Sequence, residues 1–270
     1  MLRKKIQRGK IISQSGIHEG TILIEGTKII GVEKNDIDVS DATVLDAQGQ
    51  FVSPGFIDLH VHGGNGFDFM DNTEEAFRNI SNIHARYGTT SLTPTTMSSS
   101  QQSLLGLLDT YENFGQKKWP GTSFIGIHVE GPYFAMNQKG AHDGRYVRNP
   151  NKHEYEEIIS RSSSIVRWSA APELPGALEF GNYLQSKKIL PALAHTDAIY
   201  EEVLLAFHQG FTHATHLYSA MSGVVRKNGF RHAGAVESAF LIDEMTVEII
   251  ADGVHLPPPL LKLVYKIKGP

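Results

Sequence analysis

The sequence predicts an α/β protein: a (β/α)8 barrel of the TIM type that reaches residue 270 after seven βα units, preceded by a small all-β part. From residue 54 onward, β-branched apolar segments alternate with helical segments, which is typical of parallel βα units. Residues 1–53 contain short strand-like segments with no helical period. Histidines and acidic residues follow successive predicted strands, at the end of a barrel where chemistry takes place.

Composition limits the classes of protein to which the chain can belong. Its 270 residues suit one large domain with a small appendage. A net charge of -4 gives no electrostatic reason to expect a nucleic-acid or membrane partner, and the absence of cysteine excludes thiolate ligands. No apolar run approaches the roughly 20 residues that span a bilayer, and no signal-peptide core is visible, so we expect a cytoplasmic protein.

The first 53 residues are expected to form a small β unit. It is too short to bury much core alone, so we expect it to pack against further strands. The predicted strands are 5–13, 20–25, 28–33 and 42–46.

Residues 54–270 are expected to form the incomplete barrel. Asn72 is predicted to cap the first helix, with Glu75 three residues later. The predicted strands are 56–61, 89–96, 123–129, 165–170, 189–194, 211–216 and 246–251. The predicted helices are 73–87, 101–114, 152–161, 175–187, 200–209, 233–242 and 257–268.

Five strand ends carry residues that could bind a metal. The residues expected to hold the metal come from four of these ends: His60 and His62, Glu130, His195 and His216. The fifth end carries Asp252 and His255. Nitrogen and oxygen ligands without thiolate suit one or two divalent ions of zinc, iron, manganese or cobalt, and do not choose among them. Glu130 would bridge two ions, because a carboxylate can bind both. A metal with an open coordination position activates water, so the sequence predicts metal-assisted hydrolysis.

The ordered set of motifs resembles the amidohydrolase superfamily and, within it, the N-acetylglucosamine-6-phosphate deacetylases. The matching segments are Pro54-Gly55-Phe56-Ile57-Asp58 with His60-x-His62, His128-Val129-Glu130-Gly131-Pro132, Lys139-Gly140-Ala141-His142, Ala194-His195-Thr196, Thr215-His216-Leu217-Tyr218 and Ala251-Asp252-Gly253-Val254-His255. The resemblance implies a metal-dependent hydrolase barrel with a β-sandwich built from both chain ends, of which residues 1–53 would be one part.

The resemblance also implies a reaction and a substrate. A metal-bound hydroxide would attack the acetamide of N-acetyl-D-glucosamine 6-phosphate, releasing acetate and D-glucosamine 6-phosphate. Ala141 and His142 would contact the sugar, and His142 would help to polarise the carbonyl. Ser219, Ala220 and Arg231 would meet the phosphate, with Arg231 donated by the neighbouring subunit of a homodimer; Asp252 and His255 would line the sugar site.

The chain departs from the family pattern in three places. Ser219 stands where the family usually has Asn, and Arg231-His232-Ala233-Gly234 replaces an Arg-Glu-Pro-Gly pattern. The family's general acid/base is an Asp after the eighth barrel strand, expected beyond Pro270. We therefore expect the biological protein to be longer. Asp197 and Asp252 are candidates for the base by position only.

Two alternatives remain open from the sequence. The first is another amidohydrolase, such as a dihydroorotase-like enzyme, although Glu130 stands where those enzymes usually carry a bridging lysine. The second is a non-catalytic, metal-binding homologue, which would explain the missing Asp.

Overall fold

The computed structural model describes residues 3–115, 117 and 120–269. The chain divides into two compact units, Met1–Phe56 and Ile57–Pro270, which we call the N-terminal and C-terminal units. The division falls three residues after the expected boundary at residue 53. Among the described residues, no helix has the length and apolar character required to cross a membrane.

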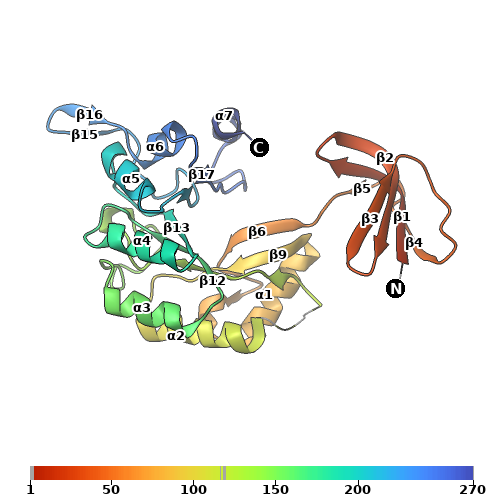
Figure 1. The fold of residues 1–270 in the computed structure, drawn as a ribbon, viewed down its shortest axis with the longest axis horizontal. Helices are drawn as coiled ribbons and strands as arrows, with labels where there is room; N and C mark the ends of the chain where they lie inside the picture. Colours follow the sequence, from red (N-terminus) through yellow and green to blue (C-terminus); the bar gives the residue numbers. More distant parts are fainter. Residues whose placement is uncertain (1–2, 116, 118–119, 270) are drawn as a thin grey trace. The chain divides into compact units, whose positions relative to one another are not determined.

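The N-terminal unit is a five-stranded sheet with β1 at its centre (Figure 1). β1 pairs antiparallel with β2 and parallel with β4 and β5, while β3 pairs with β2. The strands are β1 (Arg3–Ser13), β2 (Gly16–Glu25), β3 (Lys28–Glu33), β4 (Ala42–Asp46) and β5 (Phe51–Val52). All four predicted strands of this part are present. The second sheet of the expected sandwich is not among the described residues and stays a prediction.

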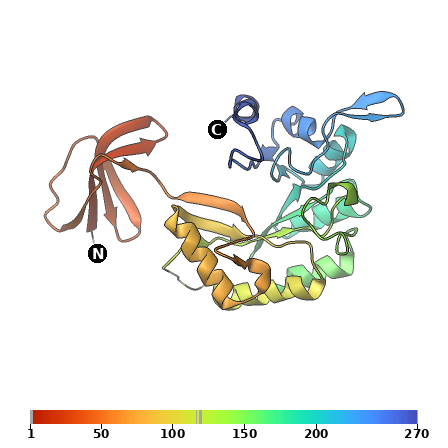
Figure 2. The same cartoon turned by 180° about the vertical axis from the view of Figure 1, so that it is seen from behind.

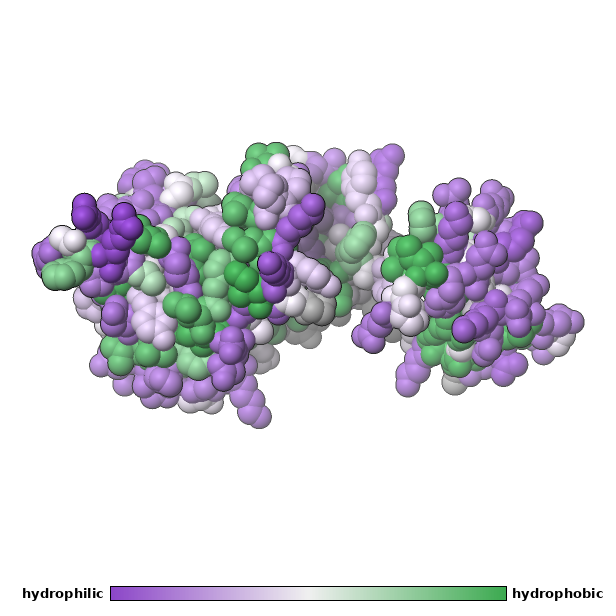
Figure 3. All heavy atoms as spheres, turned by 90° about the horizontal axis from the view of Figure 1, so that it is seen from above, coloured by the Kyte–Doolittle hydropathy of each residue, from purple (hydrophilic) through white to green (hydrophobic). Residues whose placement is uncertain are grey.

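The small sheet leaves apolar side chains uncovered. Figure 3 shows hydrophobic side chains at the surface of this unit among hydrophilic ones. The exposed apolar residues include Ile29, Ile30, Val44 and Phe51. Ile11 and Ile22 are buried, so the sheet has only a small core of its own, as its length predicts.

The C-terminal unit contains seven βα repeats. β10, β9 and β6 form one sheet, and β11, β12, β13, β14 and β17 form a second, parallel sheet. A parallel bridge from Thr95 to His128 joins the two sheets. The strands are β6 (Phe56–Val61), β9 (Thr89–Pro94), β10 (Ser123–Phe124), β11 (Ile127–Glu130), β12 (Ile165–Ala170), β13 (Leu190–Leu193), β14 (His213–Ala214) and β17 (Thr246–Val247). Closure into an eight-stranded barrel stays a prediction.

Helices follow these strands in the predicted order. The helices α1, α2 and α3 lie along one side of the strands in both views (Figures 1 and 2). The helices are α1 (Glu74–Arg86), α2 (Gln101–Thr110), α3 (Lys152–Arg161), α4 (Ala177–Ser186), α5 (Tyr200–Phe207), α6 (Ala235–Leu241) and α7 (Pro258–Lys268). Short helical turns are η1 (Phe69–Asp71), η2 (Tyr111–Gly115) and η3 (Met136–Gln138).

The predicted cap of α1 is wrong by one residue. Thr73, not Asn72, caps the helix: the Ala76 N–H donates to its hydroxyl oxygen at 3.1 Å. Asn72 instead ends η1 in the left-handed region, with φ 55°, and donates to the carbonyl of Ser103. Asn adopts this backbone more readily than most residues.

The structure adds strands that the sequence did not predict. Residues 123–129 form two strands, β10 and β11, because the chain turns between them at Gly126 with φ 132°. Two hairpins also appear: β7 (Gly63–Gly64) with β8 (Phe67–Asp68), and β15 (Val225–Lys227) with β16 (Phe230–His232).

An apolar core fixes the strands of the C-terminal unit and leaves polar residues at their carboxyl ends. Trp168 of β12 is fully buried and stacks on Tyr133, with Phe180 of α4 edge-on to both rings. Glu130, the last residue of β11, is 1% exposed. Among the described residues, no lysine or arginine pairs with this carboxylate. A buried charge without such a partner is costly, which is the first indication of a functional site here.

Candidate metal centre

Glu130 lies at the centre of a group of imidazoles. His62 Nε2 lies 3.1 Å and His60 Nε2 3.4 Å from its Oε2. His216 Nε2 lies 3.0 Å and His195 Nε2 3.3 Å from its Oε1. The structure therefore brings together all five side chains that the sequence proposed as ligands.

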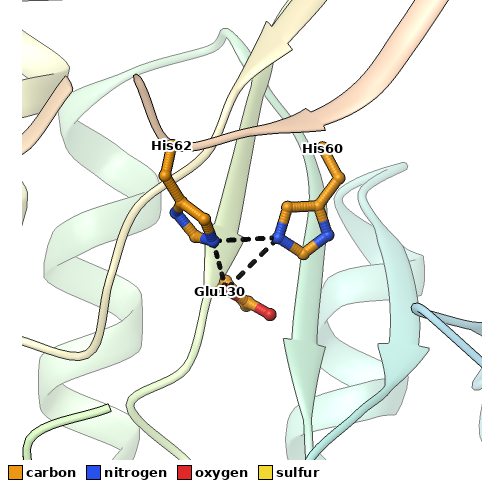
Figure 4. A group of neighbouring side chains, drawn as sticks. All are labelled: His60, His62 and Glu130. Carbon is orange, nitrogen blue, oxygen red and sulfur yellow. Dashed lines mark hydrogen bonds and ion pairs between the residues drawn. The ribbon is translucent and has the colours of Figure 1, made fainter. Parts of the chain in front are cut away.

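The five side chains form two groups that share Glu130. One is His60, His62 and Glu130; the other is Glu130, His195 and His216; within each group the possible ligand atoms lie within 4.8 Å of one another. Figure 4 shows His60 and His62 reaching from the end of β6, with their Nε2 atoms 3.1 Å apart and Glu130 below them. One carboxylate between two pairs of histidines is the arrangement expected of a bridging ligand.

The outer nitrogen of three histidines is engaged elsewhere, which leaves the inner nitrogen free to bind a metal. His62 Nδ1 lies 3.3 Å from the carbonyl of Thr95, and His195 Nδ1 lies 2.7 Å from that of Gln138. A carbonyl only accepts, so each Nδ1 carries the proton and each Nε2 keeps its lone pair. His60 Nδ1 has the same arrangement with the carboxylate of Glu248, at 2.9 Å.

The surroundings of the Glu130 Oε2 atom indicate whether a cation fits the site. It is buried and, within the described residues, accepts no hydrogen bond. Yet imidazole nitrogens surround it at 3.1–3.4 Å. When His60 and His62 are neutral, their Nε2 lone pairs face this oxygen, and the buried carboxylate then needs positive charge nearby to offset its burial. One or two divalent ions between these atoms would supply it, so the residues fit a metal.

The charges at the site are strongly coupled. Burial alone would raise the pKa of Glu130, but the charge of His60 and contacts with the neighbouring histidines hold it well below its usual value. Burial alone would lower the pKa of His60, but Glu130 and Glu248 raise it to about 9. Without metal, a proton on His60 therefore balances the carboxylate.

His142 differs from the five proposed ligands. The backbone N–H of Ser98 donates to its Nδ1 at 3.0 Å, so the neutral ring carries its proton on Nε2, 3.4 Å from Glu130 Oε2. Burial lowers the pKa of His142 and favours this neutral form. The Nε2–H of neutral His142 can thus donate a hydrogen bond at the site.

Two of the histidines sit on strained backbone. His195 has φ 47° and His216 φ 36°, each just after its strand. The left-handed conformation costs a non-glycine residue about 1–2 kcal/mol. Such conformations persist where the surrounding structure enforces them, and they also occur in turns of this chain, such as at Gln48 and Asn65.

The remaining predicted site residues are not part of this group and lie on loops and on the β15–β16 hairpin. Ser219 and Ala220 are half-buried in the loop after His216, and the carbonyl of Ala220 accepts from the N–H of Thr196 at 3.1 Å. Ala141 is exposed beside His142, and Arg231 is exposed on β16. Asp252 and His255 are exposed beyond β17 and bonded to each other, His255 Nδ1 to Asp252 Oδ2 at 2.8 Å.

The sequence did not single out Arg167 or Glu248. Arg167 of β12 and Glu248, directly after β17, form a buried ion pair next to His60. The sequence feature that could have pointed to them is a charged residue inside each of two mostly apolar predicted strands, 165–170 and 246–251. Buried charges of this kind are rarely unpaired.

Comparison with known proteins assigns the family. The profile of the Amidohydrolase family matches residues 51–268. The chain belongs to the amidohydrolase family. This family is metal-dependent, in agreement with the donor atoms around Glu130.

Related amidohydrolases carry the names of sugar-phosphate deacetylases. The N-acetylglucosamine-6-phosphate deacetylase of Vibrio furnissii is 33% identical over 217 residues, which are 80% of this chain and 53% of that protein. The N-acetylgalactosamine-6-phosphate deacetylase of Escherichia coli O157:H7 is 31% identical over 82% of this chain and 58% of that protein. This amidohydrolase chain thus spans about half the length of these relatives.

Solved structures show the same fold. The N-acetylglucosamine-6-phosphate deacetylase of Thermotoga maritima is 28% identical with a TM-score of 0.81, over 98% of this amidohydrolase and 67% of that chain. The enzyme of that name from Pasteurella multocida has a TM-score of 0.90 at 24% identity, over 99% of this chain and 69% of that one.

Proposed function

We propose that this chain carries the metal centre and sugar-phosphate site of a deacetylase, which hydrolyses N-acetyl-D-glucosamine 6-phosphate to D-glucosamine 6-phosphate and acetate. The observation that carries the proposal is the single buried carboxylate, Glu130, shared by two pairs of histidines. The deacetylase relatives support the choice of substrate. A dihydroorotase-like activity is less well supported, because carboxylate rather than lysine occupies the bridging position.

The chain's own residues would organise the reaction around the ions. His60 and His62 would hold one ion with Glu130, and His195 and His216 the other. When bound, such ions polarise a carbonyl oxygen and lower the pKa of water. The Nε2–H of His142 would donate to the acetyl oxygen as negative charge develops there, because Ser98 fixes its tautomer.

The loops would bind the rest of the substrate. Ser219 and Ala220 would contact the phosphate, and Arg231 would add positive charge from the β15–β16 hairpin of a neighbouring subunit in a homodimer. Ala141 would contact the sugar through its backbone. Asp252 and His255 would line the sugar site. The homodimer and the cytoplasmic location stay predictions from the sequence.

Neither aspartate suggested by position is suited to be the general acid/base. Backbone N–H groups of His255 and Val254 donate to Asp252, and these bonds with the His255 ring lower its pKa to about 2. Both carboxylate oxygens of Asp197 accept from side-chain amides, those of Asn137 and Gln138. The general acid/base stays the aspartate that the resemblance predicts beyond residue 270.

A second candidate substrate is N-acetyl-D-galactosamine 6-phosphate. The Escherichia coli O157:H7 relative carries that name and is nearly as similar to this chain as the Vibrio furnissii one. The two sugars differ only in the configuration at one hydroxyl group. The same metal centre and phosphate contacts would serve both, so the assay must include both.

The test measures acetate release and substrate binding by the zinc-loaded chain. Both sugar phosphates are compared with unphosphorylated N-acetylglucosamine, with and without a chelator. We expect phosphate-dependent binding by this chain. We expect acetate release that the chelator abolishes only from a longer form that carries the aspartate expected beyond residue 270. The matched control is Glu154→Gln, which removes a buried carboxylate that pairs with Arg148. Absence of both phosphate-dependent binding and acetate release would contradict the proposal.

A further inference from the structure

Glu248 contacts His60 at the ring nitrogen that faces away from the metal centre. Its Oε1 lies 2.9 Å from His60 Nδ1, and its side chain is 12% exposed. His60 Nε2 meanwhile faces His62 and Glu130. The proposed reaction gives Glu248 no role, although it lies directly behind a proposed ligand.

Arg167 holds Glu248 in this place. Its guanidinium, 6% exposed, pairs with Oε2 of Glu248. The same guanidinium donates to the carbonyl of Leu59, the residue before His60, at 2.7 Å. It also contacts two buried histidines, His128 Nδ1 at 2.8 Å and His213 Nε2 at 3.1 Å. Arg167 therefore fixes both Glu248 and the strand end that carries His60.

The partner of His60 differs in kind from those of the other ligands. His62 and His195 donate to backbone carbonyls, of Thr95 and Gln138. The Nδ1 atom of His216 has no hydrogen-bond partner among the described residues. A carboxylate fixes the tautomer of a metal-binding histidine and raises its basicity more than a neutral acceptor does.

We propose that Glu248, held by Arg167, is a positioning residue that sets the metal affinity of the His60–His62–Glu130 group, separately from the group of His195 and His216. The inference rests on the metal centre of the proposed function. It predicts that the metal affinity of one group can be changed without changing that of the other, by a substitution that alters no proposed ligand.

Glu248→Gln is the most informative substitution because it keeps the shape of the side chain. Arg167 has only donors, so it would take the amide oxygen and turn the amide NH2 toward His60. His60 Nδ1 would then accept, which moves the ring proton to Nε2, where the metal should bind. The variant thus reverses the tautomer without creating a cavity.

The experiment measures Zn²⁺ affinity and stoichiometry by chelator competition. We expect the wild type to bind two ions, and Glu248→Gln to bind one of them about 10–100-fold more weakly. Glu154→Gln is the matched control, because Glu154 is also a buried carboxylate paired with an arginine, and its side chain accepts hydrogen bonds from Arg148 and Tyr133. This variant should keep both affinities.

A second comparison separates positioning from general damage to the fold. His60→Asn removes the ligand through which Glu248 acts. In that background, Glu248→Gln should change the affinity of the remaining ion by less than about twofold, because the two effects share one path. Thermal unfolding shows whether each variant is folded. If Glu248→Gln does not fold, Glu248→Asp serves instead. The shorter side chain withdraws the carboxylate from His60 and keeps the negative charge. This variant should also bind one of the two ions more weakly.

The outcomes distinguish this inference from the function on which it rests. A wild type that binds no zinc overturns the metal centre and the inference with it. Wild-type binding that Glu248→Gln or Glu248→Asp leaves unchanged overturns the inference alone. A further loss of affinity on adding Glu248→Gln to His60→Asn also overturns it, because Glu248 would then act by another route.

Discussion

Glu130 and the histidines around it keep one another in the charge states that the metal centre needs. The carboxylate is buried at the end of β11, and its pKa is held well below the usual value despite that burial. Most of the stabilising charge in the metal-free protein comes from His60. A divalent ion would take over this role, so protons and metal compete for the same nitrogen atom.

This competition predicts how metal affinity changes with pH. Glu130 and Glu248 raise the pKa of His60 to about 9, so below that pH a metal ion must displace a proton. Zinc affinity of the His60 group should rise about tenfold per pH unit up to about pH 9 and then level off. Chelator competition at several pH values measures this slope. A flat profile in the wild type, or a slope that persists for this ion in His60→Asn, would contradict the prediction.

His142 tests the distinction between a metal ligand and a hydrogen-bond donor. Its Nδ1 accepts from Ser98, so Nε2–H is available to a substrate oxygen. In a longer form that carries the expected aspartate, His142→Asn should lower the kcat for acetate release by about 100-fold, the usual effect of removing one such donor. Zinc stoichiometry should stay unchanged. Loss of a zinc ion from this variant would show that His142 is a ligand instead.

At the residue scale, the sequence could predict which side chains come together around Glu130, but not which residues hold them in place. His60, His62, Glu130, His195 and His216 could be found because parallel strands end on the same side of a sheet, whatever their order. Arg167 and Glu248 could not be assigned, because their contact joins β12 to the end of β17. Only the three-dimensional arrangement shows that Glu248 contacts His60 and that Arg167 bonds to Glu248 and to the carbonyl of Leu59.

The first helix of the C-terminal unit depends on a single hydroxyl. The Thr73 oxygen accepts the N–H of Ala76 and satisfies one of the free donors at the start of α1. Thr73→Ala should lower the free energy of unfolding by about 1 kcal/mol. Denaturant unfolding measures the change, and Gln102→Ala on the exposed face of α2 is the control. Equal stability of the two variants would contradict the assignment of the cap.

At the element scale, long periodic segments were predictable and short ones were not. All seven helices occur where the periodicity placed them, because each contributes apolar side chains to the core, α7 with Val264 alone. The β7–β8 and β15–β16 hairpins have only two or three residues per strand, too few for an alternating pattern. The division of residues 123–129 depends on the backbone of Gly126, which sequence periodicity does not report.

Metal binding should stabilise the C-terminal unit as a whole, because its ligands come from strands far apart in the sequence. An ion present at 100 times its dissociation constant adds about 2.7 kcal/mol to the free energy of unfolding. For a unit of this size we expect Tm to rise by about 5–10 °C with zinc. Thermal unfolding with zinc and with chelator measures the difference. In Glu130→Gln, most of this zinc-dependent rise in Tm should be lost. A rise as large as that of the wild type would contradict the role of Glu130.

The most direct test of the account is anomalous diffraction at the zinc edge from crystals of the zinc-loaded chain. We predict two peaks on either side of the Glu130 carboxylate, one beside His60 and His62 and the other beside His195 and His216. A density map without a peak at Glu130, or with ions bound by other residues, would contradict the central claim that this carboxylate joins two metal sites.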